Sequence, residues 1–284
     1  MHFSFKTILV PVDFSINTEV AINKALEVAD KEGATIHLMH VLRDTLSWPS
    51  LQNNKKLYEP IAKTAAPSTE QMIMEWKSTI QETNPHIRVC CWTLHHSSVQ
   101  QSIEKKAEKL KADLIVIGKK NNHSWFPFLN TVLSSDLAKT TGCAVLTVKP
   151  GSLHNKIKTL VVPVTEDLPR HKMEAMAALC KMKRLKVHLI SFMNEDDVPV
   201  QFSSSALLKL YQWLKDTLHC QVEYTVLDKE HKARALLQYA EKVHADMLLV
   251  NPVSETRIGW MNRHISDVLS PHSRVQVLTI HQTH

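Results

Sequence analysis

One carboxylate stands where a binding or catalytic group would be expected in this sequence. Asp13 directly follows the apolar run Ile8–Val12, and Phe14–Asn17 after it offer side chains that can cap a helix. The structural alternative for Asp13 is therefore a cap on the following helix. Catalysis needs a nucleophile, a base and an orienting group that converge. Ser134 and Ser135 have no identifiable base, so we predict no catalytic residues and expect that the protein is not an enzyme.

The 17 histidines raise the question of a metal site. His37 and His40 are three apart on an expected strand, so they should point to opposite faces, and the adjacent His95 and His96 meet the same objection. No HExxH motif occurs, and no spacing of cysteine and histidine matches a structural zinc site. We predict no metal site and interpret the histidines as surface or core residues.

The glycines and cysteines exclude several classes of protein. The five glycines, at positions 33, 118, 142, 151 and 259, allow neither a Walker loop nor a GxGxxG fingerprint. The five cysteines form no CxxC pair. An odd number without that spacing argues against a disulfide framework and for a reducing compartment.

Composition and charge are those of an ordinary globular protein, with 44% hydrophobic and 22% charged residues among 284 and a net charge of +6. Lysines occur along helix-like stretches without interleaved aromatic residues, which favours a solvated helix face over nucleic-acid binding. The lysines of one such stretch are Lys105, Lys106, Lys109 and Lys111.

No apolar run approaches the roughly 20 residues of a membrane-spanning helix, and the N-terminal run is too short for a signal peptide. We expect a cytoplasmic protein without nucleic-acid or membrane partners.

The elements that must position Asp13 alternate between strands and helices. Short runs of uninterrupted apolar residues are typical of parallel strands covered by helices on both faces. Such runs lie at 6–13, 36–41, 87–94, 113–118 and 144–149, and helical patterns lie at 18–29, 69–83, 99–110 and 131–140. Residues Arg43–Ser68 carry three prolines and predict a long irregular excursion, of the kind that often forms a lid or a contact.

The second half of the chain repeats the first. Lys158–Thr165 matches Lys6–Asp13, except that Thr165 replaces the carboxylate, and further strands at 187–192, 222–227, 245–250 and 277–280 follow in the same order. Alternating strands and helices imply right-handed βαβ units. We predict an α/β fold of two tandem five-stranded parallel-sheet domains, 1–150 and 151–284, joined at Pro150–Ser152.

Each half resembles a universal stress protein domain. The resemblance is carried by Ile8–Asp13, His40–Val41, Ala112–Gly118 and Thr141–Val148. It implies the strand order 3-2-1-4-5, with Asp13 and Gly118 facing each other across the crevice where open α/β sheets bind ligands. Single-domain relatives pair through their fifth strands. We therefore expect the corresponding strands of the two halves to pair as an internal pseudo-dimer, which would protect both edges; a further homodimer stays open.

The resemblance also implies a ligand. In ATP-binding members the aspartate contacts the adenosine part, the main chain at the Val41 position contacts adenine, and a Gly-x-x-Gly loop running into a helix holds the phosphates. Here the loop keeps Gly118 but has Asn121 at the second glycine. Asparagine adopts left-handed angles more readily than most residues, so a nucleotide site stays open. The residues implied are Pro11, Val12, Asp13, Val41, Gly118, Asn121, Asn130 and Thr131.

Other features of these loops weaken the nucleotide prediction. Trp125, Phe126 and Phe128 crowd a loop that is normally small and polar, although Lys119 and Lys120 could offset phosphate charge. In the second half Asn251 replaces Gly118, and Pro252 removes an N–H group where donors are needed, so we predict no nucleotide there.

These observations favour a non-catalytic stress-response protein that acts as a regulatory or scaffolding module with a protein partner. It would require no cofactor and would have at most a degenerate site for ATP or another adenine nucleotide in the first half. The alternative is an ATP-binding stress sensor that holds adenosine with Asp13, Val41 and Gly118. An enzyme of the related adenylating type is disfavoured, because the serine- and glycine-rich pyrophosphate loop of such enzymes is absent.

Overall fold

A computed structural model describes nine segments of the chain. They are residues 4–42, 68–119, 132–164, 170–182, 184–193, 205–228, 232–252, 257–258 and 263–281. The predicted excursion at Arg43–Ser68 lies outside them except for Ser68, and the predicted loop at Lys119–Asn130 lies outside them except for Lys119. Within these segments no helix combines the length and the apolar character that a bilayer crossing requires.

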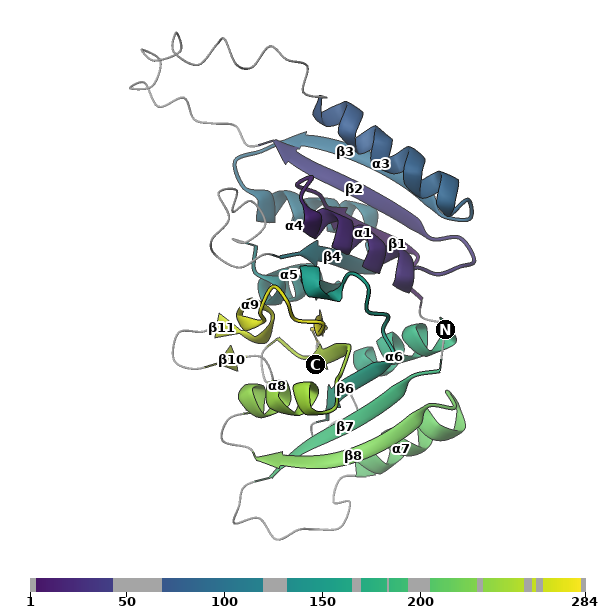
Figure 1. The fold of residues 1–284 in the computed structure, drawn as a ribbon, viewed down its shortest axis with the longest axis vertical. Coiled ribbons are helices and arrows are strands. Elements are labelled where there is room, and N and C mark those ends of the chain that lie inside the picture. The colour runs from purple at the N-terminus through teal and green to yellow at the C-terminus, as the bar shows by residue number, and fades with distance from the viewer. Residues whose placement is uncertain are drawn as a thin grey trace, which may run out of the picture.

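Ten strands of the described chain form one sheet through the length of the molecule, in the order β3-β2-β1-β4-β5-β12-β9-β6-β7-β8 (Figure 1). The strands of the first half are β1 (Thr7–Pro11), β2 (Thr35–Leu42), β3 (Arg88–His95), β4 (Leu114–Gly118) and β5 (Ala144–Val148). Those of the second half are β6 (Thr159–Pro163), β7 (Lys186–Met193), β8 (Gln221–Asp228), β9 (Met247–Val250) and β12 (Gln276–Thr279). Each half therefore has the order 3-2-1-4-5, which confirms the predicted fold class.

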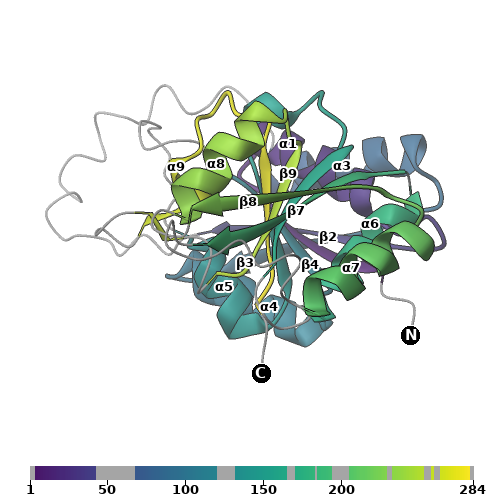
Figure 2. The ribbon, with the colours of Figure 1, turned by 90° about the horizontal axis from the view of Figure 1, so that it is seen from below.

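Helices cover both faces of this sheet (Figure 2). The apolar sides of α1 (Ile16–Val28), α3 (Thr69–Thr83), α6 (Arg170–Met182) and α7 (Ser205–Asp216) share one core cluster that extends through both halves. On the other face α4 (Val99–Leu110) and α5 (Ser134–Thr141) pack over the first half, and α8 (Lys232–Lys242) and α9 (Ile265–Val268) pack over the second. A 3₁₀ turn, η2 (Pro150–Ser152), lies where we predict the linker, and a two-stranded ribbon joins β10 (Arg257–Ile258) to β11 (Arg263–His264).

The two fifth strands join the halves. β5 and β12 run antiparallel, with Leu146 opposite Leu278, as the resemblance implied. Both leucines are 1% exposed and belong to the core cluster that spans the halves. This pairing confirms the internal pseudo-dimer, whereas the domain boundary at residue 150 stays a prediction.

A buried ion pair also links the first half to the beginning of the second half through hydrogen bonds. Lys24 of α1 is 1% exposed, and its Nζ lies 2.9 Å from Glu27 Oε2 and donates to the carbonyl of Asn155. The other carboxylate oxygen, Glu27 Oε1, accepts the N–H of Ile157 at 2.8 Å. Because each charged group has polar partners, burial of this pair leaves no unpaired charge.

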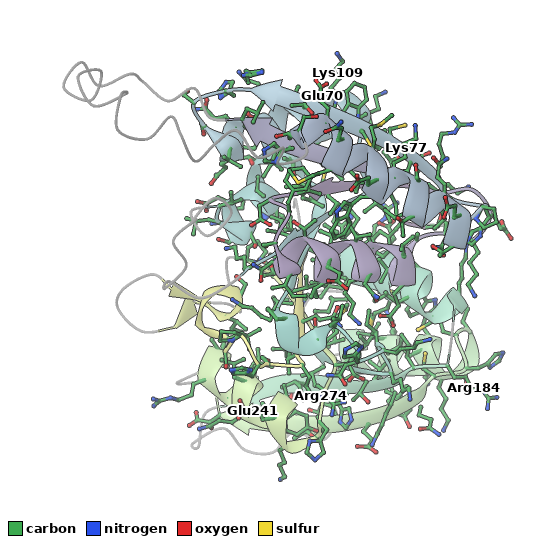
Figure 3. All side chains as sticks on the ribbon, turned by 45° about the horizontal axis from the view of Figure 1, so that its top comes forward. Glu70, Lys77, Lys109, Arg184, Glu241 and Arg274 are labelled. Atoms are coloured by element: carbon green, nitrogen blue, oxygen red, sulfur yellow. The ribbon has the colours of Figure 1, made fainter. Side chains whose placement is uncertain are left out.

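The Ala-Asp pair that opens the fourth strand has the same structural role in both halves. Asp113 Oδ2 accepts the N–H groups of Lys6 and Thr7 at 3.0 and 2.8 Å. Asp246 Oδ2 accepts those of Lys158 and Thr159, both at 3.0 Å. Arg274, labelled in Figure 3, adds an ion pair to the second aspartate. The repeated aspartate therefore aligns strands one and four at their beginnings.

Two predictions about local structure are wrong. Helix α5 begins at Ser134 instead of near Thr131, because Leu133 precedes it with an extended backbone and a side chain that cannot cap. The stretch of lysines on α4 is also not uniformly solvated. Lys106 is 6% exposed and its ammonium lies over the Trp92 ring, and this burial lowers the pKa of Lys106. The neighbouring Lys109 points outward, as Figure 3 shows.

Replacing Leu278 tests the shared core. Leu278→Ala would leave a cavity at the junction of the halves and should cost about 2–5 kcal/mol of unfolding free energy. Because one core includes both halves, we expect a single calorimetric transition that shifts as a whole. Val226→Ala, at a side chain that is 42% exposed on β8, should change stability by no more than about 0.5 kcal/mol. A Leu278→Ala protein whose first half melts separately at the wild-type temperature would contradict the shared core.

Candidate functional site

Asp13 lies just beyond the end of β1, at the carboxyl edge of the sheet, and it organises the loop into α1. Its Oδ1 accepts the Ser15 N–H at 3.1 Å, the Ser15 hydroxyl at 2.6 Å and the Thr18 hydroxyl at 2.7 Å. The helix cap itself is Ser15, whose Oγ accepts the Asn17 N–H at 3.2 Å. The structural alternative of Asp13 as the cap is therefore corrected: the carboxylate holds the residue that caps the helix.

The second carboxylate oxygen of Asp13 has a different environment. All hydrogen bonds between this side chain and other described residues end on Oδ1, and the residue is half-buried. One oxygen is thus fixed by the chain, while Oδ2 can accept a hydrogen bond from a ligand hydroxyl.

The residue after Asp13 has an unusual backbone conformation. Phe14 has φ 58°, a value that is rare for a residue with a bulky side chain. This conformation costs free energy, so contacts with neighbouring residues must stabilise it. Its ring centroid lies 4.8 Å from that of His40, and His40 Nδ1 donates to the Val12 carbonyl across 2.8 Å. The loop is therefore held against the end of β2.

Pro11, Val12 and Val41 are brought together beside Asp13, but their side chains are buried. The Val12 carbonyl accepts from His40, and its N–H donates to the Met39 carbonyl at 2.8 Å. Both main-chain groups of Val12 are thus engaged within the protein. Val12 therefore has little main-chain hydrogen-bonding capacity left for a ligand.

Gly118 ends β4 under the first turn of α1. A Cβ at this position would lie 2.0 Å from the Asn17 carbonyl oxygen and 2.6 Å from its carbon, so only glycine fits. Asn17 covers the side of Gly118 where a Cβ would stand, and the expectation that Gly118 faces Asp13 stays a prediction. The next residue, Lys119, whose charge could offset that of a phosphate, is 3% exposed.

The first turn of α5 lies at the same edge of the sheet. Ser134 Oγ is 2.6 Å from Thr147 Oγ1, and the preceding Leu133 provides no side-chain cap. Within the described residues, the buried Ser135 Oγ and Asn17 Oδ1 have no hydrogen-bond partner. Uncapped N–H groups at a helix N-terminus attract anions. The predicted ligand residues Asn121, Asn130 and Thr131 lie outside the described residues.

The second half has different groups at the corresponding edge. Lys172 of α6 is 4% exposed, and its Nζ donates to the carbonyl of Pro163 at the end of β6, at 2.8 Å. Asn251 and the buried Pro252 follow β9. The carbonyl at the end of β6 therefore accepts a hydrogen bond from a lysine of the chain itself. Sequence reasoning missed Lys172. The one sign of its role in the sequence is that it is a charged residue within an apolar helical pattern.

Two buried histidines occupy equivalent positions in the second strand of each half. His37 is 8% exposed and its Nδ1 accepts the Trp92 Nε1–H at 3.1 Å, while His188 is 1% exposed and its Nδ1 lies 2.9 Å from the Tyr239 hydroxyl. Burial lowers the pKa of both, so both imidazoles are neutral near pH 7. Among the described residues, no three histidine, cysteine, aspartate or glutamate side chains gather as a metal site requires.

With this geometry in view, comparisons with known proteins decide the family. The model of the universal stress protein family matches residues 4–149, which is more than half of the chain. The chain belongs to the universal stress protein family. A search of curated proteins gave no match.

Solved structures show the same fold over the whole chain. A universal stress protein from Archaeoglobus fulgidus is 14% identical, with a TM-score of 0.60 over 99% of this chain and 98% of that one. The cytoplasmic domain of a prokaryotic cation chloride cotransporter is 10% identical, with a TM-score of 0.53 over 97% and 95%. A universal stress protein in complex with cAMP is 15% identical, but it covers 52% of this chain and 98% of its own at a TM-score of 0.36. That last similarity is too slight to indicate the ligand of the present universal stress protein.

A side chain at position 118 should disturb α1. Gly118→Ala places a methyl group against the Asn17 main chain, and the displacement of the first turn should cost about 1–3 kcal/mol. Urea unfolding measures this loss. Asn251→Ala adds no atoms at the matching position and should cost less. Equal stability of Gly118→Ala and wild type would contradict the close packing.

The buried histidines predict a pH dependence of stability. In the unfolded chain a histidine binds a proton with a pKa near 6.5, whereas burial lowers the pKa of His37 and His188 in the folded state. The unfolded state then binds more protons, so stability should fall as the pH decreases through about 6.5. The double variant His37→Asn/His188→Asn should have a shallower pH dependence in urea unfolding between about pH 5 and 8. A slope equal to that of wild type would contradict this assignment.

Proposed function

We propose that this universal stress protein is a non-catalytic regulatory or scaffolding protein of the cytoplasm whose first half holds a low-affinity adenine-nucleotide site. The observation that carries this proposal is the divided role of Asp13. One carboxylate oxygen is fixed by Ser15 and Thr18, and the other is left to accept a ligand hydroxyl.

The surroundings of Asp13 support a nucleoside. A vicinal diol such as that of ribose offers hydroxyl donors to Oδ2. The end of β2 with Val41 lies beside this loop, since the Val12 N–H and carbonyl bond to β2 residues. A purine ring on that side and a ribose over Asp13 would direct the phosphates toward β4 and α5.

The phosphate end of the site supports only weak binding. The first turn of α5 has no side-chain cap, and the Ser135 hydroxyl has no partner among the residues that the structure describes, which favours an anion. Against this, the glycines that let a backbone wrap phosphates are replaced in the sequence, because Asn121 stands at the second glycine position. Lys119 is buried, so its ammonium group is a poor phosphate ligand.

The hydroxyl groups beside Asp13 support a non-catalytic role. Ser15 Oγ donates to the carboxylate and accepts the Asn17 N–H, and Thr18 Oγ1 donates to the carboxylate and accepts the Asp13 N–H. Both hydroxyls are therefore committed to the loop and are poorly placed as nucleophiles. His40 Nδ1, as a donor to the Val12 carbonyl, is not a base toward either hydroxyl.

An ATP sensor is the second candidate. It is favoured by Asn17 Oδ1 and Ser135 Oγ, two of the buried polar atoms that have no hydrogen-bond partner within the described residues, because a tightly bound ligand or water would satisfy them. The sensor and the scaffold would differ in their affinity for ATP, which can be measured.

Thermal unfolding with magnesium and ATP separates the two candidates. A dissociation constant of about 1 mM gives about 0.4 kcal/mol of stabilisation at about 1 mM ATP, whereas a micromolar sensor gives about 4 kcal/mol. We expect the smaller effect and no phosphate release above background. Absence of any effect at several times that concentration would contradict the nucleotide site, and phosphate release that requires Asp13 would contradict the non-catalytic role.

Asp13→Asn is the sharpest variant. Its amide oxygen can still accept from Ser15 and Thr18, but the amide nitrogen that replaces Oδ2 can no longer accept a ligand hydroxyl. We expect near-normal stability and at least about tenfold weaker ATP binding, as for a lost hydrogen bond to a charged group. Glu19→Gln removes the same charge from the exposed first turn of α1 and should leave binding unchanged. Equal loss in both variants would mean that net charge, and not Oδ2, attracts ATP.

A further inference from the structure

Two cysteines that are far apart in the sequence meet in the second half. Cys180 lies near the end of α6 and Cys220 immediately precedes β8, yet their sulfur atoms are 3.1 Å apart. Figure 2 shows α6 and α7 side by side, and both cysteines pack in or against the core cluster that these helices share. The end of α6 and the beginning of β8 lie at the amino ends of the second-half strands.

The other three cysteines have no such neighbour. All five lie in the described part of the chain and are free thiols. Cys143 Sγ donates to the Ala112 carbonyl at 2.9 Å, and Cys91 Sγ donates to the Ile73 carbonyl at 3.6 Å. Cys90 precedes Cys91 on β3, so the two side chains point to opposite faces. Among the five, only Cys180 and Cys220 place one sulfur against another.

The contact shifts the pKa values of the two thiols in opposite directions. The hydrogen bond from Cys180, helped by the main chain of Leu185, lowers the pKa of the Cys220 thiol although burial opposes this. The same contact and burial raise the pKa of Cys180. Cys220 is therefore the thiol that more readily becomes a thiolate, which is the form that reacts with oxidants.

We propose that Cys180 and Cys220 are a peroxide-reactive dithiol that closes to an intramolecular disulfide. The Cys220 thiolate attacks one peroxide oxygen, the O–O bond breaks, and protonation of the departing oxygen gives water and a Cys220 sulfenic acid. The Cys180 sulfur then attacks the Cys220 sulfur, and the hydroxyl leaves with the Cys180 proton as a second water. Two thiols are oxidised and one peroxide is reduced.

The geometry requires little movement for this step. A disulfide has its sulfurs about 2 Å apart, so the two atoms must approach by about 1 Å, within the range of a side-chain adjustment. The bond would close a loop between residues 40 apart in the sequence and would tie α6 to the beginning of β8. Restriction of the unfolded chain should make the oxidised protein more stable than the reduced one.

Oxidation of the full chain tests the proposal. After treatment with a slight excess of hydrogen peroxide, titration should find two fewer of the five thiols, and intact mass should fall by about 2 Da. Peptide mapping without reductant should yield one cross-linked pair that contains Cys180 and Cys220. The melting temperature should rise and return to its first value with dithiothreitol. A linkage between other cysteines, or thiols that stay reduced, would overturn the proposal.

Single variants give a matched control. Cys180→Ser should leave Cys220 as a sulfenic acid that a dimedone probe traps, because no resolving thiol remains. Cys220→Ser should lose both the trapped acid and the cross-link, whereas Cys91→Ser should still form the disulfide. Oxidation of Cys180 or Cys220 directly to sulfinic acid in the wild-type protein, without a cross-link, would also overturn the proposal.

Discussion

Antiparallel hydrogen bonds between β5 and β12 join the two halves of this universal stress protein. An unpaired fifth strand would present a row of free N–H and carbonyl groups to other chains. Here the two edges satisfy each other, and Leu146 and Leu278 meet in one core that also includes α1 and α6. The Lys24–Glu27 ion pair adds hydrogen bonds to Asn155 and Ile157 that also connect the two halves. The halves consequently share one core.

The carboxyl ends of β1 and β6 differ because each interacts with different side chains. In the first half Asp13 holds its own loop through Ser15 and Thr18 and retains one oxygen. In the second half Lys172 donates to the carbonyl at the end of β6. The carbonyl of Pro163 thus has a hydrogen-bond donor from the chain itself. Both halves thus keep the same strand order and the aspartate that aligns strands one and four, whereas the residues at the carboxyl ends of their first strands differ.

The features that the sequence could predict are those that depend on local pattern. Continuous apolar runs identified the strands, and the recurrence of Lys6–Asp13 at Lys158–Thr165 identified the duplication. The resemblance then implied the strand order and the β5–β12 pairing. The features that it could not predict depend on contacts between distant residues. The cover of Gly118 by Asn17, the burial of Lys106 over Trp92 and the meeting of Cys180 with Cys220 have no signature in spacing.

The central claim is that the β5–β12 ladder makes the two halves one cooperative unit. Native-state hydrogen exchange, followed by mass spectrometry, tests it most directly, since strands within one cooperative unit open only with global unfolding. Peptides from β5 and β12 should exchange with the same free energy of opening as peptides from β1 and β6. Exchange of β5 and β12 at a clearly lower free energy, with β1 and β6 still protected, would mean that the halves fold separately.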